Sequence, residues 1–139
     1  MKRYQGKTAT AIIVYPQQDK ILLIKRDTLP FKGFWALPGG RMDINETVEQ
    51  TCIREVKEET GLDVEIIYNI GDYHEQGFMD GINYDYHPTC FIVKVVGGQI
   101  MRQEDEVQEI KLFNLKELPT PLAFEHDKMI KDYKKKNET

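Results

Sequence analysis

The sequence is poor in cysteine and has no long apolar segment, and each shortage excludes a class of protein. Cys52 and Cys90 are too few for a metal site of four thiolates, and we expect both to be free thiols in the core, although a disulfide is not excluded. The longest clean apolar run, Ala11 to Tyr15, is far shorter than the roughly 20 residues of a membrane span. Residues 1–6 also lack the apolar centre of a secretory signal. We therefore expect a cytoplasmic protein that does not contact membranes.

A surplus of basic residues is absent as well. The net charge is −4, so a nucleic-acid partner is not expected. The three histidines, His74, His87 and His126, are scattered without the spacing of metal ligands, and we do not expect them to bind metal or take part in catalysis.

What remains is the composition of a globular domain, with 40% hydrophobic and 30% charged residues among 139. We expect one domain over residues 1–139, because no repeat, linker or composition break divides the chain. The pattern predicts strands surrounding one internal helix and one terminal helix, which is an α/β or α+β layered fold. The expected strands are 8–15, 21–26, 64–74, 88–96 and 109–114, and the expected helices are 46–60 and 122–136.

Three glutamates share one face of the predicted internal helix. A helix turns about 100° per residue, which places Glu59 about 40° round from Glu55 and Glu58 about 60° the other way. Like charges at such positions repel, and a helix C-terminus disfavours negative charge. A solvated acidic face is the alternative explanation. Taken alone, three such glutamates are more often a solvated face. A bound cation would offset both costs, and oxygen ligands would select Mg²⁺ or Mn²⁺.

The segment before this helix supports a metal and phosphate site. Pro38-Gly39-Gly40 predicts a turn that allows close backbone approach, so that a glycine carbonyl can reach a metal. Asn45 is the expected N-cap, and the helix N-terminus after it is a site for phosphate. Arg54 is placed to pair with Glu58 one turn later and to damp the repulsion.

Residues 40–62 resemble the Nudix box, Gly-x5-Glu-x7-Arg-Glu-(apolar)-x-Glu-Glu-x-Gly-(apolar), and every specified position matches. The resemblance implies the α/β/α sandwich of this MutT-like family, with a mixed sheet and a loop–helix–loop catalytic motif. It implies a hydrolase in which water attacks a phosphoanhydride of a nucleoside-diphosphate-linked substrate. It also implies roles for individual residues: metal ligands Glu55, Glu58, Glu59 and the carbonyl of Gly39, and a bracing pair Glu46 and Arg54.

The general base is left open by this resemblance. In the family it is either a glutamate of the box or a glutamate on a distant loop. Glu104, Asp105 and Glu106 form the candidate loop, as base or as further metal ligand. A solvated turn is the alternative for these three residues.

The flanking sequence is most similar to the ADP-ribose pyrophosphatase-like branch, both in residues 30–40 and in residues 105–127. This implies that ADP-ribose is cleaved to AMP and ribose 5-phosphate. The proline that this branch often carries about 15 residues after the box is missing, and Met79 replaces a tyrosine typical of dinucleoside-polyphosphate hydrolases. A nucleoside triphosphate, normal or oxidised, therefore stays the alternative substrate. The candidate substrate-binding residues are Arg26 and Arg41 for phosphate, and Phe34 and Trp35 for a base.

Two further expectations concern the class of protein and its assembly. A non-catalytic nucleotide sensor with a Nudix-like domain is the remote alternative, but such sensors usually have an eroded box, and this box is whole. Members of the resembled branch are often homodimers, so we expect a homodimer that binds a small-molecule nucleotide.

Overall fold

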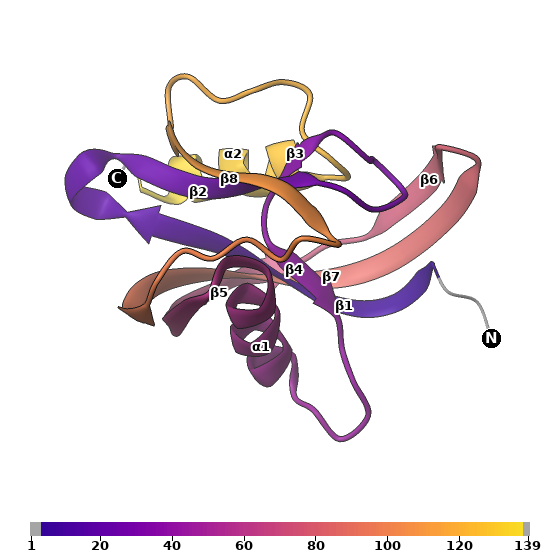
Figure 1. Ribbon diagram of the computed structural model, residues 1–139, viewed down its shortest axis with the longest axis horizontal. Coiled ribbons are helices and arrows are strands. Elements are labelled where there is room, and N and C mark those ends of the chain that lie inside the picture. The colour runs from indigo at the N-terminus through magenta and orange to yellow at the C-terminus, as the bar shows by residue number, and fades with distance from the viewer. Residues whose placement is uncertain (1–3, 138–139) are drawn as a thin grey trace.

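Figure 1 shows a computed structural model of the chain, which describes residues 4–137. Residues 1–3 and 138–139, including the first half of the segment searched for a secretory signal, lie outside the described residues. Within 4–137, no helix is long and apolar enough to cross a membrane. The elements follow in the order β1 (Gln5–Tyr15), η1 (Pro16–Gln18), β2 (Lys20–Arg26), β3 (Trp35–Ala36), β4 (Gly39–Arg41), α1 (Val48–Thr60), β5 (Leu62–Asp72), β6 (Glu75–Met79), β7 (Ile82–Gly98), β8 (Val107–Asn114) and α2 (His126–Lys136).

The strands form a mixed sheet around β1. Strand β1 runs parallel to β7, and β7 pairs antiparallel with β5 and with β6. On the other side, β2 pairs antiparallel with the end of β1, with β3 and with β8. Strands β1 and β2 form a hairpin, but only Val14 and Tyr15 of β1 pair with β2 before the strands diverge.

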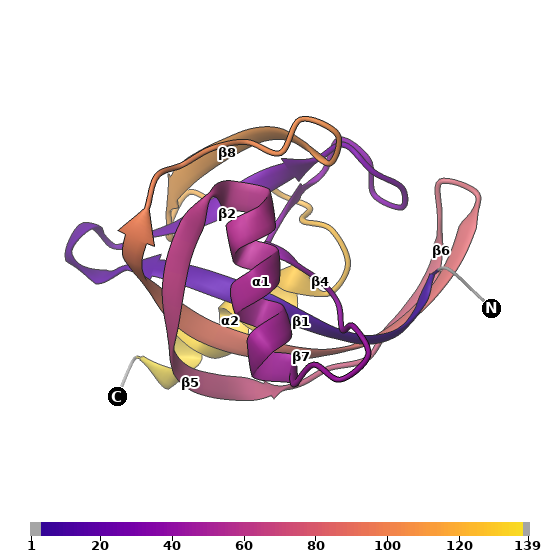
Figure 2. The same ribbon diagram turned by 60° about the horizontal axis from the view of Figure 1, so that its bottom comes forward.

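Both faces of the sheet are covered, which explains why its central strands are nearly continuous apolar runs. Alternate residues of β1 and β7 belong to two separate clusters, so that Phe91 and Val93 face one layer while Cys90 and Ile92 face the other. Helix α1 closes the first layer and α2 closes the second, on opposite sides of the sheet (Figures 1 and 2). The expected α/β/α sandwich is confirmed. Cys52 and Cys90 are both buried free thiols, as predicted.

The predicted start of the internal helix was wrong by two residues. Thr47, not Asn45, is the N-cap of α1: its hydroxyl accepts from the backbone N–H of Gln50, and the Gln50 side chain accepts from the backbone N–H of Thr47. Asn45 has φ 68° and lies in the preceding loop. The predicted end is confirmed, because Gly61 has φ 81° and donates its N–H to the carbonyl of Lys57.

The glycines before α1 also differ from the prediction. Gly39 and Gly40 form strand β4 rather than a turn, because they pair with Thr10 and Ala9 of β1. Strands β6 and β7 are joined by a turn at Asp80-Gly81, and both of these residues have positive φ. Strand β7 begins at Ile82, well before the expected Pro88, and α2 begins at His126 rather than at Leu122.

Candidate active site

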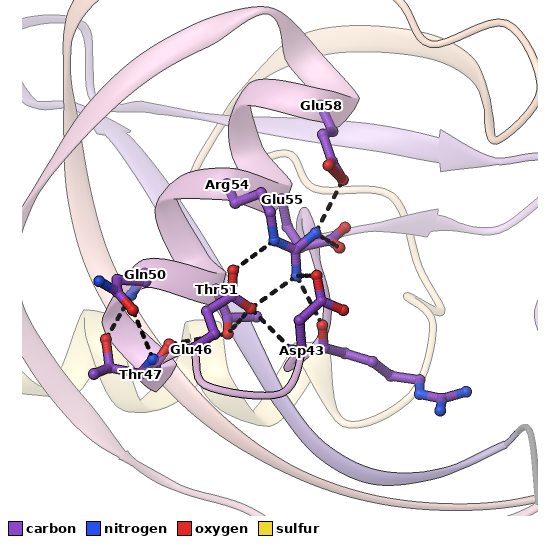
Figure 3. Close-up of polar contacts among 9 residues, drawn as sticks. Asp43, Glu46, Thr47, Gln50, Thr51, Arg54, Glu55 and Glu58 are labelled. Atoms are coloured by element: carbon purple, nitrogen blue, oxygen red, sulfur yellow. Dashed lines mark hydrogen bonds and ion pairs between the residues drawn. The ribbon is translucent and has the colours of Figure 1, made fainter.

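Arg54 lies at the centre of the polar network on α1 (Figure 3). Its Nε donates to Glu46 Oε2 at 2.7 Å, and its Nη1 donates to Glu55 Oε2 at 2.7 Å and to Glu58 Oε1 at 3.1 Å. Its Nη2 donates to the carbonyl of Arg41 at 2.9 Å. One planar guanidinium thus fixes the loop before the helix and orients two helix carboxylates at once.

Glu46 ties the loop to the helix from the other side. Its Oε1 accepts from the backbone N–H of Asp43 at 2.9 Å and from the hydroxyl of Thr51 at 2.7 Å. The hydrogen bonds from Arg54, Asp43 and Thr51, in that order, lower the pKa of Glu46 to about 2. Glu46 is therefore ionised, and its hydrogen bonds join the loop before α1 to Thr51 and Arg54 of the helix.

Strand β4 packs directly against the carboxylate face of α1. The N–H of Gly39 donates to Glu59 Oε1 at 2.9 Å. A Cβ on Gly40 would lie 2.4 Å from the Glu55 carboxyl carbon, and one on Gly39 would lie 2.2 Å from the carbonyl oxygen of Ala9. Only glycine lets the strand backbone come this close to the helix glutamates.

Burial raises the pKa of two of these carboxyl groups, Glu55 and Glu59. Glu59 is only 6% exposed, and burial, followed by the nearby charge of Glu55, raises its pKa well above the ordinary range. Burial also raises the pKa of Glu55 to about 7, although Arg54 opposes the shift. Two desolvated carboxylates side by side are unfavourable unless they are protonated or a cation lies between them. The donor set is all oxygen and borders a glycine cradle, which fits a hard divalent cation.

A cleft of about 360 Å³ opens beside this face. Its wall contains charged, aromatic and backbone groups from both halves of the sheet. The lining residues include Arg26, Gly39, Gly40, Arg41, Glu55, Glu59, Glu75, Tyr86, Glu106, Phe124 and His126.

Two of the four predicted substrate-binding residues line this cleft. These two are Arg26 and Arg41. The guanidinium of Arg26 lies 5.0 Å from the ring centre of Phe124. Phe34 and Trp35 do not line it. Phe34 packs edge-on against Phe31, and Trp35 packs edge-on against Phe113 in the α2-side core.

The acidic loop contributes one of its three residues to the cleft. Glu106 lines the cleft, and its charge raises the pKa of Glu55 and of Glu59. Glu104 and Asp105 are exposed and are not among the lining residues. Of the three loop residues predicted as a base or metal ligand, only Glu106 is therefore placed at the cleft.

A buried pair that the sequence did not indicate, Glu75 and His126, also lines the cleft. The backbone N–H of Leu37 donates to Nδ1 of His126, which leaves the proton on Nε2, 3.7 Å from Glu75 Oε2. Burial lowers the pKa of His126 to about 3 and raises that of Glu75 to about 7. The β6–β7 hairpin and α2 bring these residues together, and no local motif marks either of them.

Comparison with known proteins gives the family. A model of the NUDIX domain matches residues 6–133. An ADP-ribose pyrophosphatase of Methanocaldococcus jannaschii is 40% identical over 96% of this chain and 78% of its own length. A putative 8-oxo-dGTP diphosphatase of Bacillus subtilis is 33% identical over 88% of this chain and 76% of its own length.

Solved structures of NUDIX proteins have the same fold as this chain. A MutT NUDIX hydrolase from Burkholderia pseudomallei has a TM-score of 0.82 and 27% identity, covering 92% of this chain and 97% of that one. The NUDIX domain of Shewanella oneidensis NrtR, solved with ADP ribose, has a TM-score of 0.75 and 26% identity. The match covers 97% of this chain and 90% of that one. The chain belongs to the NUDIX family of hydrolases.

Proposed function

We propose that this chain is a Mg²⁺-dependent (or Mn²⁺-dependent) pyrophosphohydrolase that cleaves ADP-ribose to AMP and ribose 5-phosphate. The observation that carries the proposal is the packing of Gly39 and Gly40 against the carboxylates of Glu55 and Glu59 at the edge of a cleft. That arrangement provides oxygen ligands, a close backbone and room for a diphosphate in one place.

The residues that would hold the metal are Glu55, Glu58, Glu59 and the carbonyl of Gly39. When bound, the metal neutralises phosphoanhydride oxygens and lowers the pKa of a water molecule. Arg54 keeps Glu55 and Glu58 in place for this role, since it donates to both. Glu106, on the loop across the cleft, is placed to accept a proton from the attacking water, and a box glutamate is the other candidate for that step.

The charge distribution of the cleft supports a diphosphate joined to a sugar. Arg26 and Arg41 supply positive charge to pair with phosphate oxygens. Glu75, His126 and Tyr86 also line the cleft, and their carboxylate, imidazole and phenol groups can pair with the hydroxyl and amino groups of a sugar or base. The 40% identity to an ADP-ribose pyrophosphatase supports the same substrate.

A nucleoside triphosphate, normal or oxidised, is the second candidate. It is favoured by the 33% identity to a putative 8-oxo-dGTP diphosphatase and by the likeness to a MutT NUDIX hydrolase. A purely nucleotide-sensing domain is disfavoured because every specified position of the box is present, including the three glutamates that would hold the metal.

The test is a substrate panel with Mg²⁺, comparing ADP-ribose, nucleoside triphosphates including 8-oxo-dGTP, dinucleoside polyphosphates and nucleotide sugars. We expect the highest kcat/KM for ADP-ribose, with AMP and ribose 5-phosphate as products. A higher kcat/KM for 8-oxo-dGTP, with release of pyrophosphate, would transfer the proposal to the second candidate. The homodimer stays a prediction, to be checked by light scattering on the purified protein.

A further inference from the structure

The β6–β7 ribbon carries a second cluster of potential metal ligands on the face that does not line the cleft. Strand alternation turns Tyr86 into the cleft and its neighbours Asp85 and His87 to the other side. His74 immediately precedes β6, whose first residue Glu75 pairs with Tyr86. Figure 2 shows β6 and the first part of β7 extending together beyond the body of the domain.

Three side chains converge at this position although they are separated in the sequence. His74 Nε2 lies 2.7 Å from Asp85 Oδ1, and His87 Nε2 lies 3.4 Å from the same oxygen. The two imidazole rings are stacked, with centroids 4.3 Å apart and planes 13° from parallel. One ligand atom from each residue lies within 4.8 Å of the others.

We propose that His74, Asp85 and His87 bind a borderline transition-metal ion, with Zn²⁺ as the representative. Ligand atoms around a tetrahedral zinc with bonds of about 2.1 Å lie about 3.4 Å apart, so metal binding requires shifts of about 1 Å. It also requires the stacked rings to rotate until both Nε2 atoms point at the same ion. Two imidazoles and one carboxylate suit zinc, nickel or copper, whereas the all-oxygen face of α1 suits Mg²⁺. The site is partly exposed, with side-chain exposures of 50%, 41% and 55%, which leaves room for water as a fourth ligand.

The nearest cation on the neighbouring strand does not block the site. Lys7 of β1 pairs in register with His87, so the two side chains are neighbours. Its Nζ donates to the hydroxyl of Thr89 at 2.6 Å and lies 3.6 Å from Asp72. Thr89 lies two residues beyond His87, on the side opposite Asp85, so the ammonium is held away from the carboxylate of the cluster.

A metal at this cluster would connect residue 74 to β7 directly behind two cleft residues. Glu75 follows His74, and Tyr86 lies between Asp85 and His87. Binding would therefore restrain the start of β6 and the cleft wall that Glu75 and Tyr86 form. This property is independent of which nucleotide the enzyme hydrolyses.

The three histidines of the chain make the test direct. Imidazole ¹⁵N spectra of the labelled protein, recorded with excess Mg²⁺ to occupy the carboxylate site, are followed during titration with Zn²⁺. We expect the signals of His74 and His87 to change together and saturate at one equivalent. His126 serves as the internal control, because it is buried and held by the N–H of Leu37, and its signals should not change.

Surface variants separate this site from the catalytic one. His87→Gln or Asp85→Asn should weaken Zn²⁺ binding at least about tenfold, and a Zn²⁺-induced rise in Tm should disappear with it. Glu58→Gln should leave the titration unchanged. The proposal is overturned if His74 and His87 do not respond to excess Zn²⁺, if His87→Gln binds like wild type, or if Glu58→Gln abolishes the response.

Discussion

Gly40 lies against the carboxylate of Glu55, and adding one methyl group there tests whether the position of that carboxylate matters. In Gly40→Ala the new Cβ would lie 2.4 Å from both Cδ and Oε1 of Glu55 and 2.8 Å from Oε2. Carbon atoms in contact are separated by about 3.5–4.0 Å, so the carboxylate has to retreat by about 1 Å. It cannot do so freely, because Arg54 holds its Oε2 at 2.7 Å.

The expected effect is on catalysis. A displacement of about 1 Å at a reacting centre lowers turnover about a hundredfold. We therefore expect Gly40→Ala to reduce kcat for ADP-ribose by about two orders of magnitude and to raise the Mg²⁺ concentration needed for half-maximal activity. The overall fold should persist, because β4 needs no positive φ at residue 40.

The assay is steady-state release of AMP at varied Mg²⁺, with circular dichroism as the folding check. Gly97→Ala is the matched control, because a Cβ there meets only the exposed side chain of Asp63, at 3.3 Å from Oδ2. It should behave like wild type. Gly40→Ala with kcat and Mg²⁺ dependence within about twofold of wild type would refute the argument that Glu55 needs this location.

Three further substitutions examine the rest of the site. Glu75→Gln should raise KM for ADP-ribose about tenfold with little change in Mg²⁺ dependence, because a carboxyl group that lines the cleft is replaced by an amide with fewer acceptor sites; an unchanged KM would place Glu75 outside the substrate site. Arg54→Lys should weaken Mg²⁺ activation about tenfold or more, because an ammonium cannot bridge Glu46 and Glu55 together; unaltered activation would show that the bracing is unnecessary. Since the pKa of Glu55 in the metal-free protein is raised to about 7, its contribution to stability is present below about pH 4.5 and is lost as pH rises through about 7. The gain in Tm of metal-free Glu55→Gln over wild type should therefore grow from pH 5 to pH 8 and shrink when Mg²⁺ is added, and a gain that is independent of pH would contradict the shift.

The parts of the site that lie within one local segment could be predicted from the sequence. Glu55, Glu58 and Glu59 could be placed on one face because helical periodicity alone relates them. The start of that helix was missed because Asn45 and Thr47 are both good capping residues, and only the reciprocal bonds between Thr47 and Gln50 decide between them.

The rest of the cleft depends on contacts between distant segments. Glu75 and His126 are separated by 51 positions and meet only when β6 and α2 pack around the cleft. Trp35 was a candidate for stacking on a base because it lies beside the box, with core packing as an equally good alternative. It packs against Phe113 instead, since β3 pairs with β2 and β2 pairs with β8. The His74–Asp85–His87 cluster was missed for the same reason, because its spacing becomes meaningful only after β7 folds back along β6.

The most direct test of the central claim compares two glutamates of the same helix. Glu58 is 47% exposed at its side chain and has no core role, and Glu49 is exposed in the first turn, away from the carboxylate network. With ADP-ribose and Mg²⁺, Glu58→Gln should lose about a hundredfold or more in kcat at an unchanged Tm. Glu49→Gln should match wild type, and EDTA should abolish turnover of both. Turnover by Glu58→Gln within about twofold of wild type, or full turnover in excess EDTA, would contradict a metal centre on this face of α1.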